Sequence, residues 1–323
     1  MSAFSQEITM QYYFAPLEGL TDSIYRKLHH TYFPGIDRYY TPFLSPTVHR
    51  ALTAREAREL PIASDRGFTE IPQLLTKNPE DFTWMAMQCR DRGYTEVNLN
   101  LGCPSGTVTA KKKGSGMLED LDALDAFLDS VFRLSPIPIS IKTRLGLHST
   151  DEFPGILDVF NRYPICELTI HPRLRDGFYT TPIDMTAFSY AVENSKNPVC
   201  FNGNLCSKAK IEALQKTFPG VTSVMLGRGL IGNPGMLSDC KTSRENLKNF
   251  HDSLLETYLS EFGDARNAMF RLKEHWRYWF CLFEDAEKLQ KRIRKTTDIQ
   301  EYRQITAQIF ETLPICNDLN PNW

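Results

Sequence analysis

The sequence predicts an α/β protein: a (β/α)8 TIM barrel followed by an all-helical C-terminal domain. Two observations support this prediction. Short apolar or β-branched runs alternate with helical sequence up to about residue 240, and glycine nearly disappears after about residue 244. Strands that alternate with helices are typical of parallel βα units, and a series of eight such units predicts a closed barrel. We therefore place the barrel at residues 1–244 and the helical domain at 245–323.

Eight runs are candidates for the barrel strands. In chain order they are YYFAPL (12–17), RYYTPF (38–43), EIPQLL (70–75), EVNLNLG (96–102), PISIKTR (138–144), ELTIHPR (167–173), PVCFNGN (198–204) and SVMLGRG (223–229). Helical sequence lies between them, for example at 81–92, 122–134 and 207–217. A doubly wound open sheet is the alternative, but the chain has no G-x-G-x-x-G pattern of the kind that marks dinucleotide-binding folds.

Composition limits the function classes. The chain has 323 residues, of which 41% are hydrophobic and 24% charged, as is ordinary for a globular protein. No run of about 18 apolar residues and no secretory pattern appears, so we expect no membrane segment and a cytoplasmic protein. The eight cysteines include no C-x-x-C pair, so we expect free thiols and no metal site. The net charge of −2 means that a nucleic acid would have to bind local basic patches. Nothing implies a stable protein partner, and we expect a monomer.

Polar residues gather where the predicted strands end. In strand order they are Gln73, Asn100 with Cys103, Lys142 with Arg144, His171 with Arg173, the NGN of 202–204 and the GRG of 227–229. The carboxyl ends of the strands carry the active sites of such barrels. Six successive strand ends with polar residues therefore predict a functional site rather than packing.

The last two strand ends predict a phosphate site. Loops after strands seven and eight bind phosphate in many barrels. Gly203, Gly227 and Gly229 would let backbone N–H groups approach an anion closely, and Arg228 would add a positive charge. Ordinary turn glycines are the alternative.

Lys142 lies near the end of an apolar strand and would point into the barrel mouth. There it would face an electron-rich ring, such as the N1/O2 edge of a reduced flavin, whose negative charge it would stabilise. A lysine that extends to the rim is the alternative. His171 would hydrogen-bond the same cofactor, or be structural.

Cys103 follows Asn100 and Gly102 and precedes Pro104. A free thiol has a pKa near 8.5 and is mostly protonated at neutral pH, so this residue type can act as a general acid. The alternatives are a covalent nucleophile, a metal ligand and an inert buried thiol. No Cys or His lies at ligand spacing, and no base is adjacent in sequence.

These motifs resemble a known family. In order, APLEGLTD, NLNLGCP with the later GSGML, IKTRLG, HPR, FNGN and LGRG are similar to the motifs of tRNA-dihydrouridine synthases, from about residue 12 to residue 310. The N-x-x-G-C-P element with the later K-x-R-x-G is fairly specific. Three departures occur: HPR where HGR is common, NGN where an acidic third residue is usual, and APLEG where methionine often replaces the leucine.

The resemblance implies an FMN-binding catalytic barrel, a helical domain that helps to bind tRNA, and reduction of the C5–C6 bond of a tRNA uridine with NADPH (or NADH) as reductant. Cys103 matches the residue that protonates C5, while hydride from reduced FMN goes to C6. Asn100 matches a residue that orients the uracil, and we expect Arg144 to contact the substrate as well. The implied FMN contacts are Pro16, Leu17, Glu18, Gln73, Lys142, His171, Asn202, Gly203, Asn204, Gly227 and Arg228.

Two basic segments are candidates for RNA contact. Lys111 and Lys112 belong to a Lys- and Gly-rich loop close to Cys103, which would order over the substrate. In the tail, residues 271–303 hold nine Lys and Arg against six Asp and Glu, and Lys291, Arg292 and Lys295 share one predicted helix face. From charge alone, solvated surfaces are the alternative. An apolar stripe at helical spacing is expected to be core: Leu272, Trp276, Trp279, Phe280 and Phe283.

The sequence thus predicts flavin-dependent reduction of a tRNA uridine, most simply one in the D-loop. Two other functions remain open. One is an FMN barrel that reduces a small free pyrimidine, and the other is a tRNA-binding protein without catalytic activity. The sequence does not indicate which uridine is modified.

Overall fold

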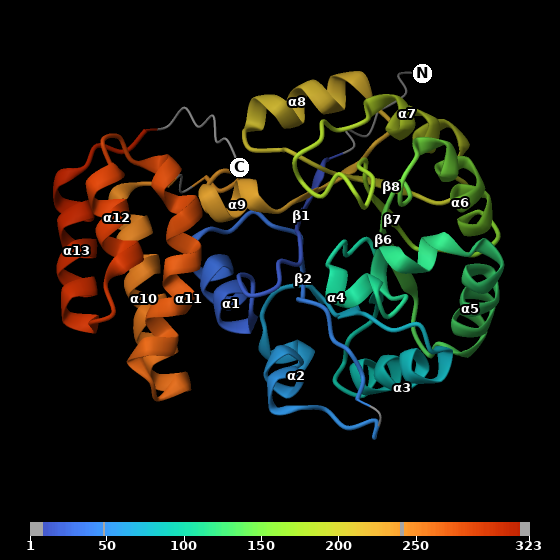
Figure 1. The fold of residues 1–323 in the computed structure, drawn as a ribbon, viewed down its shortest axis with the longest axis horizontal. Coiled ribbons are helices and arrows are strands. Elements are labelled where there is room, and N and C mark those ends of the chain that lie inside the picture. The colour runs from blue at the N-terminus through green and yellow to red at the C-terminus, as the bar shows by residue number, and fades with distance from the viewer. Residues whose placement is uncertain (1–8, 48, 240–241, 317–323) are drawn as a thin grey trace, which may run out of the picture. The chain divides into compact units, whose positions relative to one another are not determined.

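The computed structural model describes residues 9–47, 49–239 and 242–316. Its strands form one parallel sheet in the order β3-β2-β1-β9-β8-β7-β6-β5-β4 (Figure 1). The strands are β1 (Gln11–Phe14), β2 (Arg38–Tyr40), β3 (Glu70–Ile71), β4 (Gln73–Leu74), β5 (Val97–Leu101), β6 (Ile139–Arg144), β7 (Leu168–His171), β8 (Val199–Asn202) and β9 (Ser223–Leu226). Each of the eight predicted runs contains strand residues, and the (β/α)8 barrel is confirmed.

The third predicted strand is divided by Pro72. Its first half, β3, pairs with β2 through Tyr40 and Ile71, and its second half, β4, pairs with β5 through Gln73 and Asn98. Proline has no N–H to donate to a sheet, although the Pro72 carbonyl still accepts the Asn98 N–H at 2.8 Å. The two ends of the strand order therefore meet at this residue and close the barrel.

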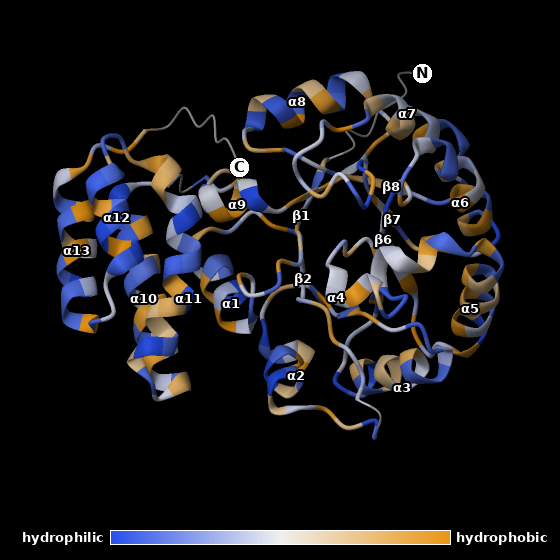
Figure 2. Cartoon of the chain, viewed as in Figure 1, coloured by the Kyte–Doolittle hydropathy of each residue, from blue (hydrophilic) through white to orange (hydrophobic). Residues whose placement is uncertain are grey.

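Helices follow the strands and cover the barrel. They are α2 (Ala54–Glu59), α3 (Pro79–Arg90), α4 (Gly106–Thr109), α5 (Leu121–Leu134), α6 (Phe153–Phe160), α7 (Met185–Asn194) and α8 (Lys208–Thr217). Helix α5 is amphipathic, and its coil alternates orange and blue in Figure 2. The Asp120 side chain caps it by accepting the Ala123 N–H, and Leu124 and Leu128 lie on its buried face.

Polar side chains fill the amino end of the barrel. Tyr13 Oη and Ser223 Oγ donate hydrogen bonds to Glu167 Oε1, at 3.1 and 2.7 Å. Arg38 and Glu96 form an ion pair at 3.0 Å. Burial raises the pKa of Glu167, and the hydrogen bond from Ser223 opposes that shift. These contacts give the polar groups at this end a structural role.

Contacts between residues divide the chain into two compact units. The first holds β1, Asp37–Gly203 and Glu212–Met225, and the second holds Leu17–Ile36, Asn204–Ile211 and the chain from Leu226 onward. The second unit thus includes sequence that precedes residue 245. The division at 244/245 into a catalytic and an RNA-binding domain remains a functional prediction, and helix α10 begins at Arg244.

The second unit is helical. Its helices are α1 (Ser23–Tyr32), α9 (Arg228–Gly232), α10 (Arg244–Phe262), α11 (Ala265–Trp279), α12 (Glu287–Lys295) and α13 (Ile299–Thr312). The predicted apolar stripe is core, as expected: Leu272, Trp276, Trp279, Phe280 and Phe283 are all buried. Among the described residues, no helix combines the length and the apolar character that a bilayer-spanning segment needs.

A chain of hydrogen bonds runs through the core of the helical unit. Trp276 Nε1 and Tyr302 Oη are 2.9 Å apart, and Tyr302 Oη and His251 Nε2 are 2.8 Å apart. An indole N–H can only donate, so Tyr302 accepts from Trp276 and donates to His251 Nε2. The His251 hydrogen is then on Nδ1, which donates to Asp252 at 2.8 Å. A single tautomer therefore satisfies the whole chain.

Candidate active site at the carboxyl ends of the strands

A network of amides joins β4, β5 and β6 and extends toward the carboxyl end of β5. Gln73 Nε2 donates to Asn98 Oδ1 at 2.8 Å, and Asn98 Nδ2 donates to Ser140 Oγ at 2.9 Å. Asn100 Nδ2 donates to Gln73 Oε1 at 2.7 Å. Asn98 and Asn100 share a face because strand side chains alternate. The network fixes the orientation of Gln73 and Asn100, two of the predicted site residues.

Asn100 also holds the turn that carries Cys103. Its Oδ1 accepts the backbone N–H groups of Gly102 at 3.1 Å and Cys103 at 2.9 Å. The carboxamide orientation is fixed because an oxygen must face these two donors. Asn100 is 8% exposed and Cys103 is partly exposed. Asn100 therefore positions Cys103 at the barrel opening, whatever else it contacts.

The Lys- and Gly-rich loop after Cys103 is folded rather than irregular. It contains α4 and a 3-10 helix at Gly114–Glu119. Ser115 Oγ donates to the Cys103 carbonyl at 2.8 Å. Gly114 has φ +58°, and a Cβ there would lie 3.0 Å from the same oxygen, so the close approach requires glycine. Lys111 and Lys112 are exposed on this loop.

Lys142 lies beside this turn. It pairs in register with Asn100 across β5 and β6, and it is partly buried. Its pKa is lowered to about 8, chiefly by burial and next by the charge of Arg144. The thiols of Cys200 and Cys103 oppose this shift. Within the described part of the chain, Lys142 Nζ has no hydrogen-bond or ion-pair partner, so its cation is available to a bound anion.

Arg144, which is predicted to contact the substrate, also makes several contacts within the protein. It is 1% exposed, and its Nε donates to the Gly102 carbonyl at 3.0 Å. Its Nη1 donates to the carbonyls of Leu174 at 2.9 Å and Phe178 at 2.7 Å. The guanidinium also lies 5.2 Å from the centre of the Tyr179 ring. These contacts make Arg144 a residue that positions the loop after β7, and its contact with substrate remains a prediction.

His171 ends β7 and is paired with Arg173. Arg173 Nη1 lies 3.0 Å from His171 Nε2, and Arg173 Nε donates to the Thr181 carbonyl at 2.5 Å. A guanidinium only donates, so His171 Nε2 accepts and its hydrogen is on Nδ1. The ring centres of His171 and Tyr179 are 5.9 Å apart. Tyr179 is not among the predicted site residues, because it lies in a loop where the sequence has no periodic pattern.

The next strand brings Asn202 and Gly203. Asn202 Nδ2 donates to the Met225 carbonyl at 2.7 Å. A Cβ at Gly203 would lie 2.5 Å from Ile183 Cδ1, so the end of that isoleucine side chain would have to shift to admit another residue. The first unit thus contains Pro16, Gln73, Asn100, Cys103, Lys142, Arg144, His171, Asn202 and Gly203, together with Lys111 and Lys112.

The other predicted residues belong to the second unit. Arg228 Nη2 donates to Asn204 Oδ1 at 3.3 Å, and Gly227 immediately precedes Arg228 at the start of α9. Asn204 has φ +39°, a conformation that asparagine adopts more readily than most residues. Asn204, the last residue of NGN, therefore suits this backbone conformation, and its side-chain oxygen accepts the hydrogen bond from Arg228. Leu17 is half-buried, and Glu18, Lys291, Arg292 and Lys295 are exposed.

Comparison with known proteins identifies the family. The dihydrouridine synthase (Dus) family model matches residues 13–319. A probable tRNA-dihydrouridine synthase 1 of Synechocystis sp. is 26% identical over 320 residues, 94% of this chain and 87% of the relative. The tRNA-dihydrouridine(16) synthase of Neisseria meningitidis serogroup B is 26% identical, over 91% of this chain and 93% of the relative.

A structural comparison supports the barrel fold. A morphinone reductase mutant, solved in complex with tetrahydroNAD, superposes with a TM-score of 0.50 and 10% identity. The match covers 70% of this chain and 85% of that one. The family assignment rests on the family model, which covers nearly the whole sequence and includes every predicted site residue. This chain belongs to the dihydrouridine synthase family of enzymes.

Proposed function

We propose that this enzyme reduces one uridine of tRNA, in the D-loop, to 5,6-dihydrouridine, with FMN as its cofactor and NADPH (or NADH) as the reductant. The observation that carries the proposal is the Asn100–Cys103 turn beside Lys142. It combines a thiol and an ammonium group that no described residue pairs, at the carboxyl ends of neighbouring strands. This is the chemistry needed to protonate one carbon of a ring and to stabilise negative charge beside it.

The residues of the first unit fit a flavin. The partly buried Lys142 cation, which has no acceptor among the residues that the structure describes, suits the N1/O2 edge, where a reduced flavin carries negative charge. Gln73, His171, Asn202 and Gly203 would hold the ring and its chain from neighbouring strands. Further contacts from Leu17, Glu18, Asn204, Gly227 and Arg228 are proposed from the sequence alone. When bound and reduced, FMN supplies the hydride that C6 of the base receives.

Cys103 holds the second hydrogen. Its thiol transfers a proton to C5, and the resulting thiolate regains a proton from solvent, so the reduction adds two hydrogens in total. Asn100 fixes the thiol's backbone, and the positive charge of Lys142 stabilises the thiolate until it is reprotonated. The uridine must leave its stack to reach the barrel opening.

Helix α12 is the basic surface that we assign to the tRNA backbone. Leu289 and Ile293 are buried, which turns Lys291, Arg292 and Lys295 toward solvent. Arg292 donates to the neutral Gln308 Oε1 at 3.0 Å, and no described carboxylate forms an ion pair with it. Phosphate contacts of this kind position an RNA without reading its sequence.

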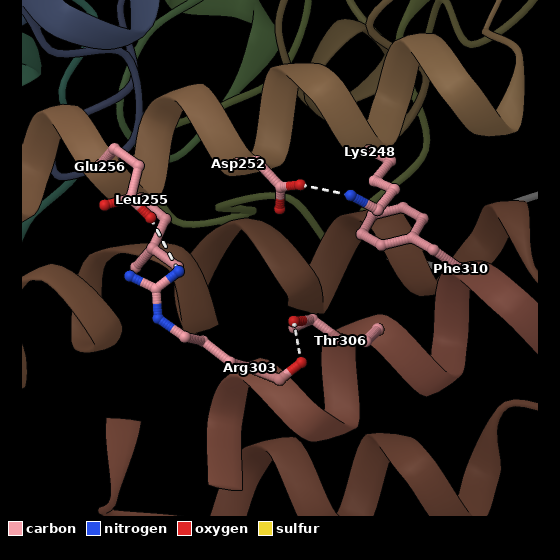
Figure 3. A pocket seen from close by; sticks show the side chains of 8 residues that line it. Lys248, Asp252, Leu255, Glu256, Arg303, Thr306 and Phe310 are labelled. Carbon is pink, nitrogen blue, oxygen red and sulfur yellow. Dashed lines mark hydrogen bonds and ion pairs between the residues drawn. The ribbon is translucent and has the colours of Figure 1, made fainter. Parts of the chain in front are cut away.

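A second charged surface of the helical unit is a poor candidate for phosphate. A cavity of about 230 Å³ is lined by residues of α10 and α13 (Figure 3). Its cations are already paired: Lys248 with Asp252 at 2.6 Å and Arg303 with Glu256 at 2.7 Å. The carboxylates would repel a phosphate, so this surface serves as the control for α12.

Changing Lys291, Arg292 and Lys295 together to glutamine is expected to weaken tRNA binding and its dependence on salt. The plot of log K against log salt has a negative slope, and each lost phosphate contact reduces its magnitude by about 0.7 to 0.9. The magnitude should therefore decrease by about 2 to 3. The measurement is a tRNA titration at several salt concentrations, with Lys248→Gln as the matched control. An unchanged slope in the triple variant would remove α12 from the RNA-binding surface.

The function itself is tested by substrate choice. The purified enzyme, supplied with FMN and NADPH, should reduce a tRNA transcript and leave free uridine and orotate essentially unreduced. Comparable turnover of a free pyrimidine would favour a small-molecule reductase. A protein that binds tRNA but neither binds FMN nor reduces uridine would be a binding module. The relative from N. meningitidis is named for position 16, which makes that uridine the first to examine.

A further inference from the structure

We propose that Arg271 and His275 of α11 are positioning residues, which fix the backbone of residues 17–21 and couple it to the RNA-binding helices. The inference rests on the proposed function, because Leu17 and Glu18 are proposed flavin contacts. The segment directly follows the carboxyl end of β1, where barrel loops carry functional residues. The segment, α11 and α12 all belong to the second unit.

The segment is a tight turn whose carbonyls are bound by side chains distant in sequence. Gly19 has φ +78°, and Thr21 Oγ1 accepts the Leu17 N–H at 2.9 Å. Arg271 Nη1 donates to the Gly19 carbonyl, and His275 Nε2 contacts the Leu20 carbonyl at 2.9 Å. Two adjacent carbonyls are thus held by residues one helical turn apart on α11.

Asp22 extends the same anchor. Arg271 Nε lies 3.5 Å from Asp22 Oδ2, and Tyr258 Oη donates to both carboxylate oxygens, at 3.0 and 3.1 Å. Asp22 Oδ1 also accepts the Tyr25 N–H at 2.9 Å and so caps α1. The Arg271 guanidinium therefore contacts both the turn and the start of the helix that follows it.

The His275 ring lies between two backbone carbonyls and two aromatic rings. Burial lowers the pKa of His275 to about 4, so the imidazole is neutral at physiological pH and has one N–H. Nε2 faces the Leu20 carbonyl at 2.9 Å and Nδ1 faces the Arg271 carbonyl at 3.0 Å, so the single N–H donates to one of these two oxygens. Stacking on Tyr25, at 4.7 Å between ring centres, and on Trp279, at 5.5 Å, prevents the ring from turning.

The other side of α11 reaches the basic helix. Lys273, between the two anchoring residues, donates to the carbonyl of Thr296, the residue at which α12 ends. Helix α11 thus contacts residues 17–21 through Arg271 and His275 and the end of α12 through Lys273. An RNA bound to α12 would restrain α11 and, through it, the turn. Coupling of this kind is reciprocal: RNA would raise flavin affinity, and flavin would raise RNA affinity by the same factor.

Hydrogen exchange tests the anchor without flavin or RNA. In Arg271→Met, which keeps the aliphatic stem and removes the donors, amide exchange in residues 17–21 should accelerate by about 10- to 100-fold. Arg271→Lys, which keeps the charge, should give an intermediate rate. Arg277→Met is the matched control, because Arg277 is exposed on the same helix and pairs with Glu274, one turn away on that helix. Equal exchange in Arg271→Met and wild type would overturn the proposal.

Flavin affinity tests the coupling. Adding an unmodified tRNA transcript should tighten FMN binding to the wild-type protein about 3- to 10-fold, and this gain should vanish in Arg271→Met but not in Arg277→Met. A wild-type protein whose FMN affinity does not respond to tRNA would overturn the coupling. A wild-type protein that binds no FMN at all would instead contradict the proposed function and leave the exchange result standing, so the two failures are distinguishable.

Discussion

Replacement of Cys103 with alanine is expected to lower the rate of dihydrouridine formation by about 10²- to 10⁴-fold, the usual contribution of a positioned general acid. FMN and tRNA affinity should change little, because Asn100 Oδ1 contacts the backbone N–H of residue 103 and not its side chain. The turn therefore survives the substitution, while the proton donor is lost. The measurement is the rate of dihydrouridine formation with reduced enzyme and saturating tRNA.

Cys166→Ala is the control for Cys103→Ala. Cys166 is an exposed thiol just before β7, at the opposite end of the strands from the candidate site. Its loss should leave the rate unchanged. A Cys103→Ala enzyme that turns over at the wild-type rate would exclude the acid role. A variant that has lost FMN would mean that Cys103 supports the cofactor instead.

Lys142→Met is expected to stabilise the FMN-free protein and at the same time to reduce FMN affinity and activity. The pKa of Lys142 is lowered from 10.5 to about 8, which means that folding disfavours its charged form. Removing that charge should raise the free energy of unfolding at pH 7 by about 1 to 3 kcal/mol. The loss of the only proposed cation at the flavin edge should lower activity by about 10²-fold or more.

The lowered pKa of Lys142 also predicts how the stability difference between Lys142→Met and the wild type changes with pH. Below pH 8 the lysine is protonated in both the folded and the unfolded state, so the stability difference between variant and wild type is at its largest. Between pH 8 and 10.5 the folded protein releases the proton first, and the difference shrinks. Denaturant titrations of both proteins at pH 7 and pH 9.5 measure this difference in the free energy of unfolding. A variant that is less stable at pH 7, or a difference that grows with pH, would contradict the prediction.

Much of the barrel could be predicted because its signals are local. Buried runs followed by turns mark all eight strand positions, and the proline in EIPQLL marks the interruption at residue 72. The period of two along NLNLG places Asn98 on the same face as Asn100, so the Asn98 contact with Gln73 could have been found. The order of the motifs was enough to predict the family, and the family model confirms that prediction.

The parts that could not be predicted depend on contacts between distant residues. Arg144 donates to carbonyls 30 and 34 positions later, in a loop with no pattern. The Leu17–Thr21 turn is bound by side chains more than 250 positions away, on a helix that the sequence marks only as amphipathic. Side-chain donors that bind backbone carbonyls leave no trace in periodicity, because any residue offers the carbonyl.

The most direct test of the central claim is nucleotide-resolved mass mapping of tRNA from cells that lack the gene. The account predicts that a dihydrouridine position of the parent, most simply in the D-loop, reverts to uridine, that the wild-type gene restores it, and that the Cys103→Ala gene does not. An unchanged dihydrouridine map in the deletion strain, or full restoration by Cys103→Ala, would contradict it.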